Sequence, residues 1–427
     1  MNRREFLGLG AAATALTGLT PSAGLAGGGD DVPPPKVDRA NVKPRNRRPY
    51  AGIDWATAHQ VNGTTHMHPH NDLEQVVRER NIGFLTASSY YPSRPIYPWR
   101  DEVYPKGVPT SDWPVMYKGK MTRGPFDWNR IVAQWADHIP EKAKKGWPPY
   151  PFKVSGRNYG PKSFPADMLE APNAEHHGFR LADGRPAGRL HICAPGSAYV
   201  SGTFDAHDRM LTVTHGYCSG SGEFWGTAID RMIEKLIVPD GGGVTINHPT
   251  WSRHDRAFLL ELLDWDPRVL GIEVLESGVN SEHYWDWVLA TGRQCYGLFV
   301  PDHGLHKTDF GICVLCVPER TQAACLRAYR DGNFYGAAHG LGELMFTSIA
   351  FDAAGVRATT DRPARLEVVT ARGVRKAVEG TEVSWRCPKD DGSREGPAVE
   401  VFARIRATAL DGTNERLFTQ ANMLVAG

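Results

Sequence analysis

The chain has no excess of one charge and, beyond its first 26 residues, no long apolar run. Its 49 lysines and arginines nearly balance 48 aspartates and glutamates, so the formal net charge is only +1. A balanced chain has no general attraction to nucleic acid or to a membrane surface, and we predict no nucleic-acid partner. No later stretch approaches the roughly 20 apolar residues that a membrane helix needs. The mature chain should therefore contain no integral membrane segment.

The sequence also lacks the motifs of the common nucleophilic hydrolases. It has no Gly-x-Ser-x-Gly elbow, no convincing nucleophile–base pair and no internal repeat. Cysteine is sparse, with an odd count of seven. Cys313 and Cys316 have CxxC spacing, but they lie in an apolar run (311–317) that predicts a strand, where residues i and i+3 face opposite sides. We predict core packing for both, rather than redox or metal chemistry.

The N-terminus has the features of an export signal. Arg3 and Arg4 precede a mildly apolar run rich in Ala, Gly and Thr (8–19), and small residues follow at 24–26. This order is typical of a cleaved signal, and the paired arginines followed by x-Phe-Leu are typical of a twin-arginine signal. An ordinary secretory signal is the alternative, which the low hydrophobicity of the run disfavours. We expect residues 1–26 to engage the twin-arginine export machinery and the mature protein to be periplasmic or secreted.

Four further regions follow from composition and periodicity. Residues 27–54 are rich in Gly, Pro and charge and predict a linker, whereas 55–345 alternates strand-like runs with helical patterns. That alternation predicts a parallel α/β sheet or barrel. An insertion rich in Pro, Trp and Tyr interrupts it at about 92–164. From 346 to 427, short strands with intervening turns predict a small all-β C-terminal module.

The most informative local feature is the pair His66 and His68, at the end of the first predicted strand. Residues i and i+2 of a strand point to the same face, so the two imidazoles should converge on one point. In α/β barrels the carboxyl ends of the strands meet at one mouth. Polar residues follow the later strands too, and the full set of candidate ligands is His66, His68, Glu175, His191, His248 and Asp302.

These donor types define the expected chemistry. Histidine nitrogens and carboxylate oxygens suit zinc, manganese or iron. Six candidates with one shared carboxylate suit a pair of ions, which can activate a water and hold the oxygens of a transferring phosphoryl group. The sequence thus predicts a hydrolase with two divalent metal ions as cofactors and a small-molecule substrate, most simply a phosphoester.

The ordered motifs resemble those of the polymerase-and-histidinol-phosphatase (PHP) superfamily of metal-dependent phosphoesterases. The resemblance spans roughly residues 60–345 and rests on Thr65-His66-Met67-His68, Asn173-Ala174-Glu175-His176, Leu190-His191-Ile192, Asn247-His248-Pro249, Gly271-Ile272-Glu273-Val274 and the Asp302 segment. It implies a distorted (β/α)7 barrel with two or three metals at its mouth. It also implies that His66, His68, Glu175 and Asp302 hold one metal, and that Glu175 bridges to a second held by His191 and His248.

Two departures from the family pattern affect the third metal. The family has Thr-Asp-His at the end of its second strand, where this chain has Ala87-Ser88-Ser89, and it ends its last motif Asp-x-His, where this chain has Asp302-His303-Gly304. A local register shift would recruit His303 or His306. We expect a two-metal site with the third position vacant or altered, and we include His303 among the candidate ligands.

The remaining candidates and functions stay open at this point. Arg253 and His254 follow the Asn-His-Pro motif and would bind phosphate oxygens, although both fit a solvated helix start as well. Glu273 fits either a partner that orients a ligand histidine or an ordinary polar strand end. Two other functions are alternatives to a phosphoesterase. An amidohydrolase-like enzyme would use the same metal site to cleave a non-phosphate bond, and a noncatalytic binding protein would contain the metal without catalysing a reaction.

Overall fold

The computed structural model describes residues 34–68, 77–88, 115–117, 120–122, 164–199, 223–276, 278–302, 311–338, 344–388 and 400–424. The chain divides into two compact units, Met1–Pro33 and Pro34–Gly427, and all that follows concerns the second. The predicted signal lies outside the described residues. So does nearly all of the insertion, apart from the antiparallel pair β3 (Val115–Tyr117) and β4 (Lys120–Thr122).

A six-stranded sheet carries most of the candidate ligands. Its order is β10-β9-β8-β7-β6, with β11 paired to β9. β8, β9 and β11 run parallel, whereas β6, β7 and β10 pair with antiparallel neighbours. The bounds are β6 (Glu175–His176), β7 (Ile192–Cys193), β8 (Val244–Ile246), β9 (Val269–Glu276), β10 (Val279–Asn280) and β11 (Tyr296–Val300).

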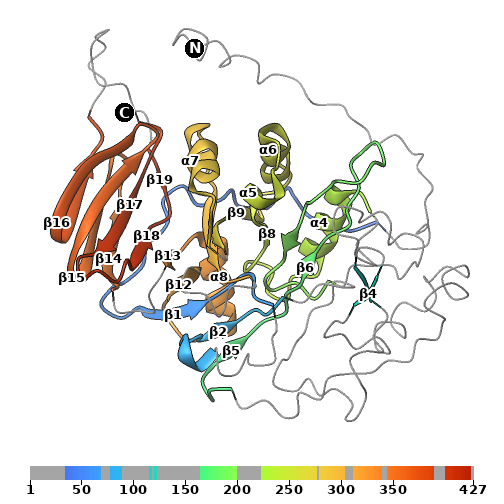
Figure 1. Ribbon diagram of the computed structural model, residues 1–427, viewed down its shortest axis with the longest axis horizontal. Helices are drawn as coiled ribbons and strands as arrows, with labels where there is room; N and C mark the ends of the chain where they lie inside the picture. Colours follow the sequence, from blue (N-terminus) through green and yellow to red (C-terminus); the bar gives the residue numbers. More distant parts are fainter. Residues whose placement is uncertain are drawn as a thin grey trace, which may run out of the picture. The chain divides into compact units, whose positions relative to one another are not determined.

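An eleven-stranded sheet joins the N-terminal strand to the C-terminal region. Its order is β14-β15-β17-β18-β13-β12-β1-β2-β5, with β16 paired to β15 and β19 to β17. In Figure 1 the red C-terminal strands stand beside one another. β18 pairs with β13, so they continue the sheet. The bounds are β1 (His59–Gly63), β2 (Phe84–Leu85), β5 (Leu169–Glu170), β12 (Gly311–Val317), β13 (Phe334–Ala338), β14 (Phe346–Phe351), β15 (Gly355–Thr370), β16 (Gly373–Arg386), β17 (Phe402–Ala409), β18 (Arg416–Phe418) and β19 (Asn422–Met423).

Helices lie between the strands of the predicted α/β region, and α6 and α7 both contact β9. Local capping explains two of their starts. Asp255 accepts hydrogen bonds from Ala257 N and Phe258 N at the start of α6, and Thr321 accepts one from Ala324 N at the start of α8. The bounds are α4 (Trp225–Glu234), α5 (Pro249–Ser252), α6 (Arg256–Asp264), α7 (Glu282–Ala290) and α8 (Gln322–Asp331). No described helix is long and apolar enough to cross a membrane.

The fold is therefore mixed α/β with large sheets, whereas the predicted closed (β/α)7 barrel is not confirmed. Within the described residues the two sheets do not join into one ring. The end of β11 meets the segment after β1 only through a parallel bridge between Met67 and Asp302. Several strands, among them β2, β6 and β7, are two residues long.

The described core has three apolar clusters, and the two largest lie on either side of β12. Cys313 and Leu315 belong to the cluster with Trp225, Trp285 and Phe299, whereas Val314 and Cys316 belong to the cluster beneath the C-terminal strands. The two cysteines of the CxxC motif thus face opposite sides, as the strand periodicity predicts. Both are free thiols and buried.

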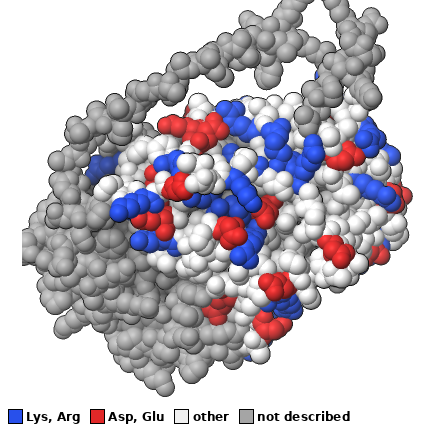
Figure 2. Space-filling view, turned by 180° about the vertical axis from the view of Figure 1, so that it is seen from behind, with Lys and Arg blue, Asp and Glu red and all other residues white. Residues whose placement is uncertain are grey.

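Polar contacts tie distant segments to this core. Arg404 on β17 is buried, donates to Asp286 (2.9 Å) and Glu282 (2.6 Å) on α7, and lies over the Trp285 ring. Arg45, in the predicted linker, donates to the carbonyl oxygens of Leu263 and Val269. On the face that Figure 2 shows, acidic side chains lie among basic ones, as expected from the near balance of charge.

Candidate metal centre

The two histidines of the His-x-His motif lie just beyond the end of β1 and converge as their spacing predicts. Both are buried, and their Nε2 atoms are 3.1 Å apart. Ser88 holds the intervening residue from both sides, because its N–H donates to Met67 O (2.7 Å) and its hydroxyl accepts from Met67 N (3.1 Å). Ser88 therefore supports the backbone between the two histidines.

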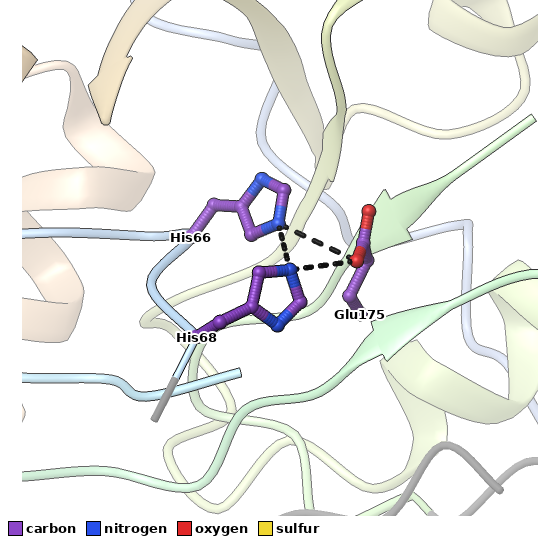
Figure 3. Close-up of side chains that lie close together, drawn as sticks. All are labelled: His66, His68 and Glu175. Carbon is purple, nitrogen blue, oxygen red and sulfur yellow. Dashed lines mark hydrogen bonds and ion pairs between the residues drawn. The ribbon is translucent and has the colours of Figure 1, made fainter. Parts of the chain in front are cut away.

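Glu175, on β6, faces two groups of histidines with its two oxygens. Its Oε2 lies 3.1 Å from His68 Nε2 and 3.5 Å from His66 Nε2 (Figure 3). Its Oε1 lies 2.8 Å from His191 Nδ1 and 3.3 Å from His248 Nε2. One buried carboxylate therefore joins two sets of donor atoms.

Asp302 completes the first set. Its Oδ1 is 3.2 Å from His66 Nε2 and 3.1 Å from His68 Nε2. Its φ of 47° is unusual for a residue with a side chain. Two backbone bonds hold this conformation, from Asp302 N to His66 O (3.1 Å) and from His68 N to Asp302 O (3.2 Å). His248 also has a positive φ, 29°, and such strain concentrates at functional sites.

The first set has the size of a small metal's coordination shell. Around a tetrahedral zinc with bonds of about 2.0–2.1 Å, neighbouring ligand atoms lie about 3.3–3.4 Å apart. The separations among His66 Nε2, His68 Nε2, Glu175 Oε2 and Asp302 Oδ1 given above are 3.1–3.5 Å. Glu175, His191 and His248 form a second group whose donor atoms lie within 4.8 Å of one another. A further group, His66, His248 and Asp302, overlaps both of these. The residues present therefore fit metal binding, with Glu175 common to two of the three groups.

Hydrogen bonds fix which nitrogen of His66 and which of His248 faces the site. Glu273, fully buried on β9, accepts from His66 Nδ1 (2.8 Å) with one oxygen and from His248 N (2.8 Å) with the other. The Ser252 hydroxyl donates to Arg189 O and so accepts from His248 Nδ1, both at 3.0 Å. In both rings the Nε2 lone pair is left facing the site. The sequence left two interpretations of Glu273 open. These contacts support the one in which Glu273 orients a candidate ligand histidine.

The electrostatics of the cluster favour a cation. Burial alone would lower the pKa of His66, but the surrounding acidic groups, including Glu273 and Asp302, raise it well above its ordinary value. Burial would raise the pKa of Glu175, yet the neighbouring histidines hold it well below the usual range. Protons therefore occupy the place of a cation in the metal-free chain. Metal binding should displace them and should strengthen as pH rises.

Asparagines position the ligand-bearing segments. Asn173 donates to Thr65 O (2.8 Å) and Thr86 O (3.0 Å), and it accepts from Ala194 N, so it joins the ends of β1, β2 and β7. Asn247 accepts from Cys193 N (3.1 Å) and donates to Glu175 Oε1 (3.3 Å). Both asparagines stand next to or two residues from a candidate ligand in the sequence, and this proximity is the signal that could have indicated their role.

Arg253 and His254 are the candidates for phosphate binding. Arg253 is exposed at the end of α5 in a left-handed conformation, with φ 56°. His254 is buried, which lowers its pKa to about 3, and its Nε2 has no hydrogen-bond partner among the described residues. The His254 imidazole is therefore neutral near pH 7, where it can still donate one hydrogen bond through its N–H group. His303 and His306 lie outside the described residues.

Glu276 is a buried carboxyl near the cluster that sequence analysis missed. β9 shifts register against β11, because Glu273 pairs with Leu298 whereas Leu275 pairs with the next residue, Phe299. This bulge adds one residue, which turns Glu276 to the same face as Glu273. Burial raises the pKa of Glu276 to about 8. A bulge gives no signal in the sequence of a strand that is buried along its whole length, so only the structure could reveal this group.

The Glu276→Gln variant is expected to change how the stability of the metal-free protein depends on pH. The pKa of Glu276 is about 8 in the folded chain, well above the ordinary value of 4.5 that applies in the unfolded chain. Its proton therefore stabilises the fold fully below about pH 4.5, and this contribution is lost as pH rises through about 8. Glutamine does not titrate. Between about pH 5 and pH 9 the free energy of unfolding of the variant should therefore fall by a few kcal/mol less than that of the wild type. Urea unfolding at both values tests this, and an identical loss in the two proteins would contradict it.

Comparison with known proteins adds one structural similarity. No family model matches the chain, and no curated protein matches its sequence. A solved structure from Bacteroides vulgatus, of a two-domain protein containing a predicted PHP-like metal-dependent phosphoesterase, aligns with a TM-score of 0.38 and 10% sequence identity. The alignment covers 90% of this chain and 97% of that one. Similarity at this level does not bear on activity, so the site rests on the contacts described above.

Proposed function

We propose that the chain is a metal-dependent hydrolase, specifically a phosphoesterase that uses two divalent ions such as zinc, manganese or iron. The observation that carries this proposal is the placement of Glu175, whose Oε2 faces His66 and His68 while its Oε1 faces His191 and His248. A carboxylate shared in this way is what a metal pair requires. The PHP relationship and its distorted barrel belong to the same proposal, supported by the convergence of the ends of β1, β8 and β11.

The chain's own residues have defined tasks in this proposal. Glu273 and Ser252 hold the Nε2 lone pairs of His66 and His248 toward the site. The exposed Arg253 and the buried His254, whose Nε2 has no partner among the described residues, would bind phosphoryl oxygens. Two bound ions would supply an activated water and stabilise the charge that develops on the phosphoryl oxygens. No serine or cysteine nucleophile is needed.

Export is a separate part of the proposal. Its support is the Arg3-Arg4 motif followed by a weakly apolar run and small residues. Fractionation of cells that make the native chain should find the mature protein in the periplasm or the medium. Retention in the cytoplasm with residues 1–26 intact would reject this part.

Turnover of matched substrates tests the hydrolase proposal. We expect the protein to hydrolyse phosphoesters after loading with zinc, manganese or iron, to lose this activity with a chelator and to regain it when metal returns. Hydrolysis of amides or lactones alone would favour the amidohydrolase-like alternative, since water activation is common to both. Tight metal retention without any turnover would favour a noncatalytic binding protein.

A further inference from the structure

An arginine beside the second group of candidate ligands has no assigned role. Arg189 lies two residues before His191, in the segment that leads into β7, and it is partly exposed. Its carbonyl oxygen accepts the Ser252 hydroxyl, which in turn binds His248. The backbone of Arg189 thus belongs to the support of the ligands, while its side chain lies at the rim.

Trp251, on α5, holds this side chain in place. The Arg189 guanidinium carbon lies 5.1 Å from the centre of the indole ring, and Nη1 donates to Trp251 O (3.4 Å). The same indole lies 4.7 Å from the His248 ring and 5.5 Å from the His191 ring, measured between centres. The guanidinium is therefore one indole ring away from two candidate ligands, and the cation–π contact keeps it there.

The charge on Arg189 has no acidic partner among the described residues, since its described contacts are with Trp251. Several other described arginines are paired with carboxylates, such as Arg231 with Glu223 and Arg268 with Asp266. A guanidinium fixed at the rim with donors left over is suited to an anion, because its planar fork matches two oxygens of a phosphate.

We propose that Arg189, supported by Trp251, is the substrate's anion-binding residue and selects phosphomonoesters over diesters and neutral amides. This inference rests on the proposed function. Two divalent ions with the carboxylates of Glu175, Asp302 and Glu273 would leave one positive charge at the site, and Arg189 adds a second. A dianionic phosphomonoester complements that excess better than a monoanionic diester or an uncharged amide does.

Two variants of Arg189, with a matched control, test the assignment. Arg189→Ala should weaken binding of inorganic phosphate by about 10- to 100-fold in titration calorimetry and raise KM for a phosphomonoester by a similar factor. The metal content should not change. Arg189→Lys should recover part of the loss, because it restores charge without the fork. The control is Arg256→Ala, since Arg256 lies over the Trp287 ring at 4.9 Å and has no assigned role.

Trp251→Leu gives a second test that keeps the guanidinium. It should weaken phosphate binding by a smaller factor, because Arg189 loses its support. Unchanged phosphate affinity and KM in Arg189→Ala would overturn the inference, as would loss of metal from that variant. A wild-type protein with neither metal nor esterase activity would instead reject the proposed function.

Discussion

Replacing Glu175 by glutamine is expected to lower bound metal from about two equivalents per chain to less than one and to reduce hydrolysis by about a thousandfold or more. The two oxygens of Glu175 face different histidine pairs. Glutamine has the same shape but no charge, and its amide group must point donor hydrogens at one of these pairs. One substitution should therefore weaken metal binding by both sets of donor atoms.

Elemental mass spectrometry and phosphoester turnover on the same samples measure this effect. Glu261→Gln is the control, because Glu261 is exposed on α6. Circular dichroism should show the same folded content in both variants. Full metal content in Glu175→Gln would mean that the carboxylate is not a shared ligand, and the two-metal assignment would fail.

Replacing Glu273 by glutamine should lower metal affinity by about 10- to 100-fold, the usual effect of removing a group that orients a metal-binding histidine. Glu273 accepts two hydrogen bonds, from His66 Nδ1 and from the His248 backbone N–H. A glutamine has one acceptor oxygen, so its NH2 group must face the other donor. Either His66 loses its orientation or the backbone at His248, already at positive φ, shifts.

Competition with a chelator of known affinity measures the change. Glu379→Gln, on the exposed edge of β16, is the matched control. A Glu273→Gln protein that binds metal as tightly as the wild type would show that Glu273 is only a strand-end polar group, the alternative left open by the sequence.

The sequence was most informative where residue type alone restricts the chemistry. His66, His68, Glu175, His191, His248 and Asp302 could be proposed together because few other patterns place these donor types after successive strands, and the structure brings their side chains into one cluster. Their role as ligands remains a prediction. Glu273 was recognised with two possible roles, since its partners depend on how neighbouring strands align.

Features created by tertiary contacts could not be predicted in this way. The two sheets do not close within the described residues, which depends on where each strand leaves its partner rather than on its apolar pattern. Glu276 reaches the ligand face through a bulge in an entirely buried strand. Arg189 and Trp251 meet across 62 residues, and neither carries a motif that would have indicated the contact.

The most direct test of the central claim is the metal content of the chain, measured by elemental mass spectrometry on protein that was exported natively and purified without chelator or affinity metal. We predict about two equivalents of zinc, manganese or iron per chain. A value near zero, unchanged after metals are added back, would contradict the account, and the cluster around Glu175 would then be a structural network of histidines and carboxylates.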